Sequence, residues 1–271
     1  MILEKETVQK FRENGAAALP GAFADWVDKL RAGVAWNMES PSSDVRIYYG
    51  EKETDGSGKF FGDYCNWQRI PEYEKFIFNS PAAKLARQLM GAETVQLFHE
   101  HVFVKEAMAK VGTPWHQDMP YYCIDVERSV SFWIPLDDVP RERTLEFVAG
   151  SHLWGKHFRP DRFNGQPLNQ NDGMEAIPDI DADRSSYDIL GWALKAGDAV
   201  AFDFRTVHGA PANKSTSSAR RAFALRLVGD GAVFNRLPGR VSSPPFPDVV
   251  LDNGASLDGE QFPLLLSAKK P

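Results

Sequence analysis

Beyond Gly91 the chain consists of short β-rich runs separated by turn-forming residues, and this pattern constrains the fold most strongly. β-branched and aromatic residues favour strands, whereas Gly, Pro, Asn and Asp favour turns. The runs do not alternate regularly with helical patterns, so a parallel α/β sheet is disfavoured. Many short strands of this kind predict a jelly-roll barrel. The runs lie at residues 95–105, 129–136, 145–148, 199–204 and 221–228.

Helical patterns occupy the N-terminal third of the chain. Apolar residues recur at helical spacing in residues 7–14, 22–34 and 81–90. We interpret these stripes as core-facing rather than as a cofactor site, because apolar helix faces are usually buried. The 271 residues contain no evident linker or repeat. We therefore expect a single domain over residues 1–271, mainly β with flanking helices, in a cupin-like architecture with a helical N-terminal preface.

Charge and cysteine content exclude several classes of function. The formal net charge is −6, and no basic run is longer than a pair, so we expect no nucleic-acid partner. Only Cys65 and Cys123 are present, which fits a reducing compartment and excludes a cysteine zinc site. No stretch approaches the roughly 18 apolar residues of a membrane span. We expect a cytoplasmic protein with a small-molecule substrate and no membrane partner.

A candidate metal site begins with His116 and Asp118, which stand two residues apart. On a strand such residues project to the same face, so both could reach one ion. A distant strand of the same barrel could bring His208 to them. Two imidazoles and one carboxylate suit iron(II), whereas structural zinc needs four ligands. Taken alone the pair is weak evidence, because strand residues of these types are more often solvated or hydrogen-bonded.

The other histidines offer one competing pair. His99 and His101 also share a strand face, but they have no convincing third partner, so we interpret them as half-buried strand residues. His152 and His157 lie near a strand end and in the following loop. We expect both to be structural or solvated.

Two arginines open the run at residues 220–228. Alternation places Arg220, Ala222, Ala224 and Arg226 on one face and the bulky residues on the other. The bulky face is expected to pack against helices, which leaves a small-residue cavity with an arginine at either end. A guanidinium inside a barrel needs an anion, and its planar fork matches a carboxylate. Spacing alone nevertheless favours an edge-strand arginine paired with a surface acid.

As a set, these residues resemble the phytanoyl-CoA dioxygenase family of iron(II)- and 2-oxoglutarate-dependent oxygenases. The resemblance covers about residues 95–230. It rests on HVFVKE at 101–106, TPWHQD at 113–118, SFWIPLDD at 131–138, LEFVAGSH at 145–152, Gly197-Asp198, His208-Gly209 and Arg220-Arg221-Ala222.

The resemblance implies a double-stranded β-helix with His116, Asp118 and His208 as the catalytic iron ligands. It implies that Arg220 holds the distal carboxylate of 2-oxoglutarate, with Trp133 and Lys105 as candidates beside it. For Trp133 and Lys105, strand packing or a solvated tip is an equal alternative.

The implied reaction uses Fe(II), 2-oxoglutarate and O2 to hydroxylate an unactivated C–H bond of a small metabolite. Relatives that halogenate have a small residue in place of Asp118, so its presence favours hydroxylation, with desaturation and ring closure left open. Two departures from the family are Ala210, where some members have serine, and a shorter turn at residues 142–144. The alternatives are a cupin-like metal- or sugar-binding module and a catalytically inactive relative.

Two further features concern the substrate side. Trp115, Tyr121 and Tyr122 either form an aromatic wall beside the metal or pack in the core. The polar segment at residues 160–187 is either a lid over the barrel mouth or a surface insertion.

Overall fold

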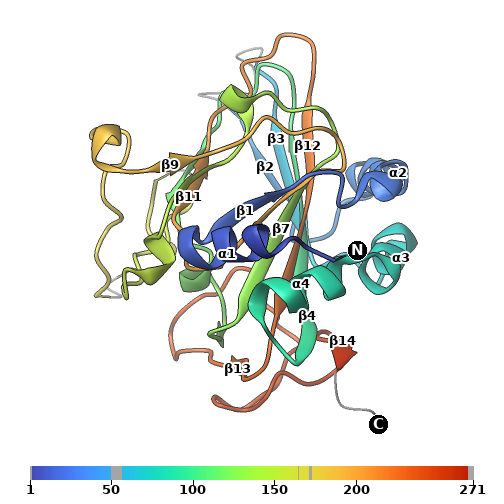
Figure 1. Ribbon diagram of the computed structural model, residues 1–271, viewed down its shortest axis with the longest axis vertical. Helices are drawn as coiled ribbons and strands as arrows, with labels where there is room; N and C mark the ends of the chain where they lie inside the picture. Colours follow the sequence, from blue (N-terminus) through green and yellow to red (C-terminus); the bar gives the residue numbers. More distant parts are fainter. Residues whose placement is uncertain (1, 50–56, 164, 171–172, 268–271) are drawn as a thin grey trace.

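Two antiparallel β-sheets dominate the computed structural model, which describes residues 2–49, 57–163, 165–170 and 173–267. Figure 1 shows α2 and α3 on one side of the larger sheet and the strands β9 and β11 on its other side. This arrangement confirms the predicted jelly roll with flanking helices.

Four α-helices form within the described residues. Gly15 and Gly91 adopt left-handed backbone conformations at the ends of α1 and α4, which glycine tolerates without strain. The predicted helix at 22–34 divides into a 3-10 turn, Ala24–Trp26, and the longer α2. No helix in this part of the chain combines the length and apolar character of a membrane span. The helices are α1 (Lys5–Asn14), α2 (Val27–Glu39), α3 (Pro71–Asn79) and α4 (Ala82–Met90).

The larger sheet has the order β1-β10-β7-β12-β4-β3-β2, and β14 pairs with β4 beside this path. Every pairing in it is antiparallel. Its strands are β1 (Ala16–Leu19), β2 (Arg46–Tyr48), β3 (Phe60–Tyr64), β4 (Thr94–Lys105), β7 (Ser129–Pro135), β10 (Ala199–Phe202), β12 (Arg220–Val228) and β14 (Leu264–Ser267).

The smaller sheet has the order β5-β11-β8-β9, and a separate ribbon pairs β6 with β13. Its strands are short, because turns and 3-10 segments interrupt this half of the barrel. They are β5 (Thr113–His116), β8 (Glu146–Val148), β9 (Ile189–Leu190) and β11 (His208–Ala210), and the ribbon contains β6 (Ile124–Asp125) and β13 (Val233–Phe234).

The two faces of β12 separate the helical core from the barrel interior. Phe223 is fully buried under α3, with ring centroids 4.8 Å from Tyr73 and 5.4 Å from Phe76. Truncating such a side chain to alanine costs about 3–5 kcal/mol. On the opposite face, Ala222 and Ala224 join a cluster inside the barrel. The alternation predicted for this strand is therefore confirmed.

Strand β4 has one edge divided between two partners. β3 pairs with it from His101 to Lys105, and β14 pairs with it from Thr94 to Gln96. Its other edge pairs with β12 along almost the whole strand. Strand β14 thus completes the backbone hydrogen bonding of the central strand β4.

Candidate metal centre and cosubstrate pocket

His116 and His208 lie directly opposite each other in the β5–β11 pair, with ring centroids 4.2 Å apart. His208 also packs against the rings of Phe147 and Phe202, at 5.8 and 4.5 Å. Strand register thus places the two imidazoles together, and aromatic packing fixes one of them.

Asp118 reaches the same point from a turn rather than from a strand. β5 ends at His116, and Asp118 caps the 3-10 segment Met119–Tyr121. The expectation that a strand carries both residues is therefore wrong for Asp118. Gln117, which stands between the two candidate ligands, points away from them and donates to the carbonyl oxygens of Arg205 and Lys156. The side chains of His116 and Asp118 therefore still lie on the same side of the chain.

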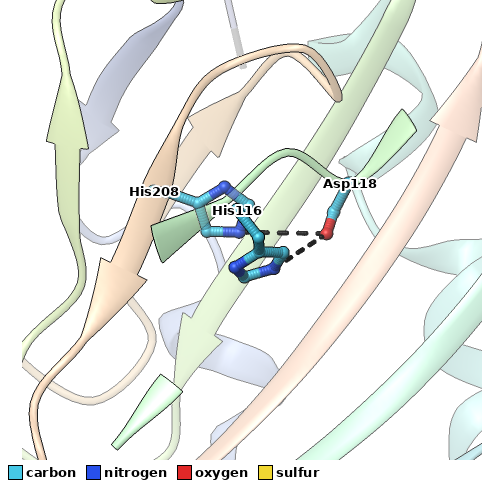
Figure 2. Close-up of side chains that lie close together, drawn as sticks. All are labelled: His116, Asp118 and His208. Carbon is cyan, nitrogen blue, oxygen red and sulfur yellow. Dashed lines mark ion pairs between the residues drawn. The ribbon is translucent and has the colours of Figure 1, made fainter. Parts of the chain in front are cut away.

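The three side chains converge on one point (Figure 2). Asp118 Oδ1 lies 3.5 Å from His116 Nε2 and 3.8 Å from His208 Nε2. One candidate ligand atom from each residue lies within 4.8 Å of the others. Among the described residues, this is the one group of three or more His, Cys, Asp or Glu side chains close enough to share an ion.

The backbone holds both imidazoles in the form that binds a metal. His116 Nδ1 lies 2.8 Å from the carbonyl oxygen of Pro114, and His208 Nδ1 lies 2.9 Å from that of Thr206. A carbonyl oxygen only accepts, so each Nδ1 carries a proton, and Nε2, which faces Asp118, is the atom of each ring that can bind a metal. Burial, followed by the charge of His116, lowers the pKa of His208 to about 3, so its ring is neutral.

Asp118 is an ionised, buried carboxylate. Burial alone would raise its pKa, but Arg226 and the two histidines hold that pKa well below its usual value. Arg226 Nε lies 3.2 Å from Asp118 Oδ2 and 2.5 Å from the hydroxyl of Tyr122. Two imidazole nitrogens and one carboxylate oxygen form a donor set that fits iron(II).

The other histidines lack such a set. His99 and His101 lie on β4 beside β12, but they belong to no three-residue ligand group among the described residues. His99 is 2% exposed, so the expectation of half-burial is wrong for it. His152 Nε2 lies 3.0 Å from the carbonyl oxygen of Arg12, a structural role, and His157 is exposed.

A pair of buried cations lies deeper in the barrel. Arg220 on β12 is directly opposite Lys105 on β4, and they are 5% and 1% exposed. Lys105 Nζ donates to Thr113 Oγ1 and to the carbonyl oxygen of Pro211, both at 3.2 Å. Arg220 Nη1 donates to the carbonyl oxygen of Arg143. Neither side chain forms an ion pair with a carboxylate within the described part of the chain.

Burial has strong electrostatic effects on this pair. Desolvation, then the charge of Arg143, lowers the pKa of Arg220 to about 10. Desolvation, then the charge of Arg220, lowers the pKa of Lys105 well below its usual value. A buried cation is stable only when an anion or hydrogen-bond acceptors compensate it. An anionic ligand such as a carboxylate would compensate this pair.

Arg221, rather than Arg220, is the arginine that pairs with an acid on the solvent side of β12. It binds Asp137 through its backbone N–H and its Nε, both at 3.0 Å, and through Nη2 at 2.5 Å. The edge-strand interpretation is wrong for Arg220, because β12 lies between β7 and β4 and Arg220 faces inwards. Of these two neighbours, Arg221 is the solvent-side arginine that pairs with an acid.

Apolar side chains adjoin both the cations and the histidines, because Trp133 lies beside Arg220 and Phe147 packs against His208. Trp133, Phe147, Ala222 and Ala224 belong to one buried cluster, which Ala210 borders. The Trp133 ring centroid lies 6.0 Å from Arg220 Cζ. Trp133 and Lys105 thus both adjoin Arg220.

Tyr121 connects the metal-bearing turn to two long segments. Its ring lies edge-on to His116, and its hydroxyl donates to the carbonyl oxygen of Asp161 at 2.5 Å. Its carbonyl accepts from the N–H of Ser243 at 2.7 Å. The Tyr122 hydroxyl accepts a hydrogen bond from Arg226, and Trp115 packs against a different apolar cluster, which contains Val207. Of the three expected wall residues, only Tyr121 contacts a ligand histidine through its ring.

Comparison with known families identifies the chain. A sequence model of the family described as "Phytanoyl-CoA dioxygenase (PhyH)" matches residues 11–222. The chain belongs to the phytanoyl-CoA dioxygenase family. This membership confirms the predicted family and, with it, Fe(II), 2-oxoglutarate and O2 as the predicted cofactors. A comparison with curated proteins finds no match.

Several solved structures share the fold over most of the chain. The non-heme alpha ketoglutarate dependent carbocyclase SnoK from nogalamycin biosynthesis is 26% identical, with a TM-score of 0.74 over 97% of this chain and 96% of that one. The epimerase SnoN in complex with Fe3+, alpha ketoglutarate and nogalamycin RO is 25% identical, with a TM-score of 0.72 over 96% and 98%. EctD from S. alaskensis, at 18% identity and a TM-score of 0.63 over 84% and 77%, supports the fold alone.

Proposed function

We propose that this chain is an Fe(II)- and 2-oxoglutarate-dependent dioxygenase that hydroxylates an unactivated C–H bond of a small metabolite. The main support for this proposal is that His116, Asp118 and His208 converge on one point. The same barrel also contains the opposed cations Arg220 and Lys105. We also propose that residues 1–271 act as one oxygenase domain, which is supported by the pairing of β14 with β4 beyond the family match.

Each residue then has a defined role. His116, Asp118 and His208 hold the iron, Arg220 binds the distal carboxylate of 2-oxoglutarate, and Lys105 adds a second positive charge. Trp133 forms the wall beside Arg220. When bound, iron(II) with 2-oxoglutarate and O2 supplies the oxidising power that removes hydrogen from a C–H bond, while 2-oxoglutarate becomes succinate and CO2.

The chain itself contributes charge, orientation and exclusion of water. Imidazole ligands carry no negative charge, so Asp118 would be the one negative ligand, and the backbone carbonyls orient the two rings. Trp133, Ala222 and Ala224 surround Arg220 with apolar side chains, which would strengthen an ion pair between Arg220 and a bound carboxylate. Tyr121 places the segment around Asp161 beside His116, which supports a lid role for residues 160–187.

A second outcome of the same chemistry is rearrangement without hydroxylation. The similar structures include a carbocyclase and an epimerase, and both names describe products that keep no added hydroxyl group. Asp118 is compatible with this outcome, because it only disfavours halogenation. Product mass separates the outcomes: hydroxylation adds one oxygen atom, ring closure removes two hydrogens, and epimerisation leaves the mass unchanged.

Anaerobic titration with Fe(II) and 2-oxoglutarate tests the proposal. We expect a visible charge-transfer band that requires both components, and succinate release once O2 is admitted. His208→Ala should abolish the band, while the matched control His157→Ala, at an exposed histidine, should retain it. A metabolite screen scored by succinate then identifies the substrate.

Two results would contradict the proposal. Metal binding without any effect of 2-oxoglutarate would indicate a cupin-like metal- or sugar-binding module. A band without succinate under any substrate tested would indicate a catalytically inactive relative.

A further inference from the structure

We infer that Arg226 and Tyr122 reserve one oxygen of Asp118, so that this carboxylate offers the metal a single oxygen and the remaining coordination positions stay free. Arg226 is thus a positioning residue for the ligand set. The inference rests on the proposed function, and its test separates the failure of one from the failure of the other.

The two oxygens of Asp118 face different partners. Oδ1 is the atom nearest the imidazole Nε2 atoms, at 3.5 and 3.8 Å. Oδ2 lies 3.2 Å from Arg226 Nε on the other side. The carboxylate is therefore divided between a metal-facing oxygen and an arginine-facing oxygen.

Burial and a hydrogen bond to Tyr122 fix the position of the Arg226 side chain. Arg226 and Asp118 are 5% and 4% exposed, so no bulk water competes for Oδ2. Tyr122 accepts a hydrogen bond from Arg226 Nε at 2.5 Å, and its hydroxyl also interacts with the Asp118 side chain. The ring of Tyr122 packs edge-on against Phe98 and Phe204, at 4.9 and 5.2 Å. The contact to Oδ2 is thus part of the packed core.

A free carboxylate can bind a metal with one oxygen or with two. If His116, Asp118 and His208 each gave a metal one atom, positions would remain on it for 2-oxoglutarate and O2. A second oxygen from Asp118 would occupy one of these positions. Arg226 opposes that by keeping Oδ2 in a charge-assisted hydrogen bond.

Arg226→Met tests the inference with Co(II) as the metal probe. Methionine keeps the apolar bulk of the side chain and removes the donor, so Asp118 becomes free to bind through both oxygens. We expect the variant to bind Co(II) at least as tightly as the parent, with a changed Co(II) visible spectrum. The affinity of the Co(II)-loaded variant for 2-oxoglutarate should fall about tenfold.

Arg221→Met is the matched control, because it removes an arginine–aspartate pair from the same strand on its solvent side. It should leave the spectrum and the 2-oxoglutarate affinity unchanged. Circular dichroism and thermal unfolding establish that each variant folds. An Arg226→Met protein that folds and retains the parent spectrum and 2-oxoglutarate affinity would overturn the inference.

Tyr122→Phe gives the second variant if Arg226→Met fails to fold. It keeps the ring packing and removes only the hydroxyl that Arg226 and Asp118 share. We expect a smaller change in the same direction, and the parent spectrum and affinity in this variant would overturn the inference. A parent protein that fails to bind Co(II) at all would instead contradict the proposed function.

Discussion

Arg220 lies directly opposite Lys105 across the β12–β4 pair, and neither cation meets a carboxylate among the described residues. Two buried positive charges facing each other are unfavourable unless a ligand compensates them. An anionic ligand bound beside Arg220 and Lys105 would supply this compensation. The apoprotein therefore keeps part of its interior in an arrangement that an anion would stabilise.

Arg220→Met should weaken 2-oxoglutarate binding about 100-fold, because a charge-assisted bidentate pair in a dry pocket is worth roughly 2–3 kcal/mol. Metal affinity should stay the same, since Arg220 is not a metal ligand. Calorimetric titration of the Co(II)-loaded protein measures both. Arg221→Met provides the control, and an unchanged affinity in Arg220→Met would show that 2-oxoglutarate binds elsewhere.

Lys105→Met should stabilise the apoprotein by about 1–2 kcal/mol at pH 7. The folded protein holds the pKa of Lys105 well below its ordinary 10.5. Below pH 10.5 the unfolded chain therefore binds more protons at this position than the folded protein, so the stability of the parent falls as the pH is lowered. The difference between variant and parent should shrink towards pH 10.5. Urea denaturation at several pH values measures it, with the exposed Lys10→Met as control; a destabilised variant at pH 7 would contradict this account.

Glu100→Gln should flatten the pH dependence of stability. Complete burial raises the pKa of Glu100 from 4.5 to about 8, although the Asn66 N–H partly opposes this. Between these values the unfolded chain ionises while the folded protein stays protonated, so parent stability decreases as pH rises from 4.5 to 8. At pH 8.5 the variant should exceed the parent by about 1–3 kcal/mol in the free energy of unfolding.

At pH 5 the Glu100→Gln variant and the parent should differ by less than about 1 kcal/mol. Chemical denaturation at both pH values provides the test. Glu74→Gln, at an exposed position on α3, is the matched control. Equal stabilities of variant and parent at pH 8.5 would mean that the buried carboxyl is compensated in another way.

Asp230→Ala should lower the free energy of unfolding by about 1–3 kcal/mol at pH 7. Asp230 accepts hydrogen bonds from the N–H groups of Glu93 and Thr94 and from the Thr94 hydroxyl, so it ties the start of β4 to the end of β12. Partial burial on its own would raise the pKa of Asp230, yet these donors lower it to about 2.

The stabilisation by Asp230 is present above its ordinary pKa of 3.8 and is lost as pH falls through about 2. The gap between Asp230→Ala and the parent should therefore close at low pH. Thermal unfolding from pH 7 to pH 2 follows this gap, with the exposed Asp28→Ala as control. A gap that is independent of pH would assign the effect to lost packing.

Local patterns predict the parts of the fold that depend on local periodicity. The alternation in residues 220–228 correctly separated the face of Arg220 from that of Phe223, because a strand has a period of two. α3 was missed, although Pro71 at its first turn and the spacing of Tyr73, Phe76 and Ile77 were available signals. β1 was missed because its sequence AAAL favours helix, and only pairing with β10 makes it a strand.

The remaining relations in the site depend on strand register. Lys105 faces Arg220 because the β4–β12 pair aligns distant segments in one particular register. Arg226 reaches Asp118 because the barrel brings β12 close to the turn that follows β5. No short-range pattern encodes that alignment. The identity of the inward-facing residues was predictable, whereas their partners were not.

The shared edge of β4 has a consequence for handling the protein. β14 covers the backbone of β4 from Thr94 to Gln96, which β3 leaves unpaired. Ending a recombinant chain before Leu264 would expose this edge together with apolar side chains such as Val95, and open edges recruit strands from other molecules. Purified protein shortened in this way is expected to self-associate, whereas a tag placed after β14 leaves the edge protected.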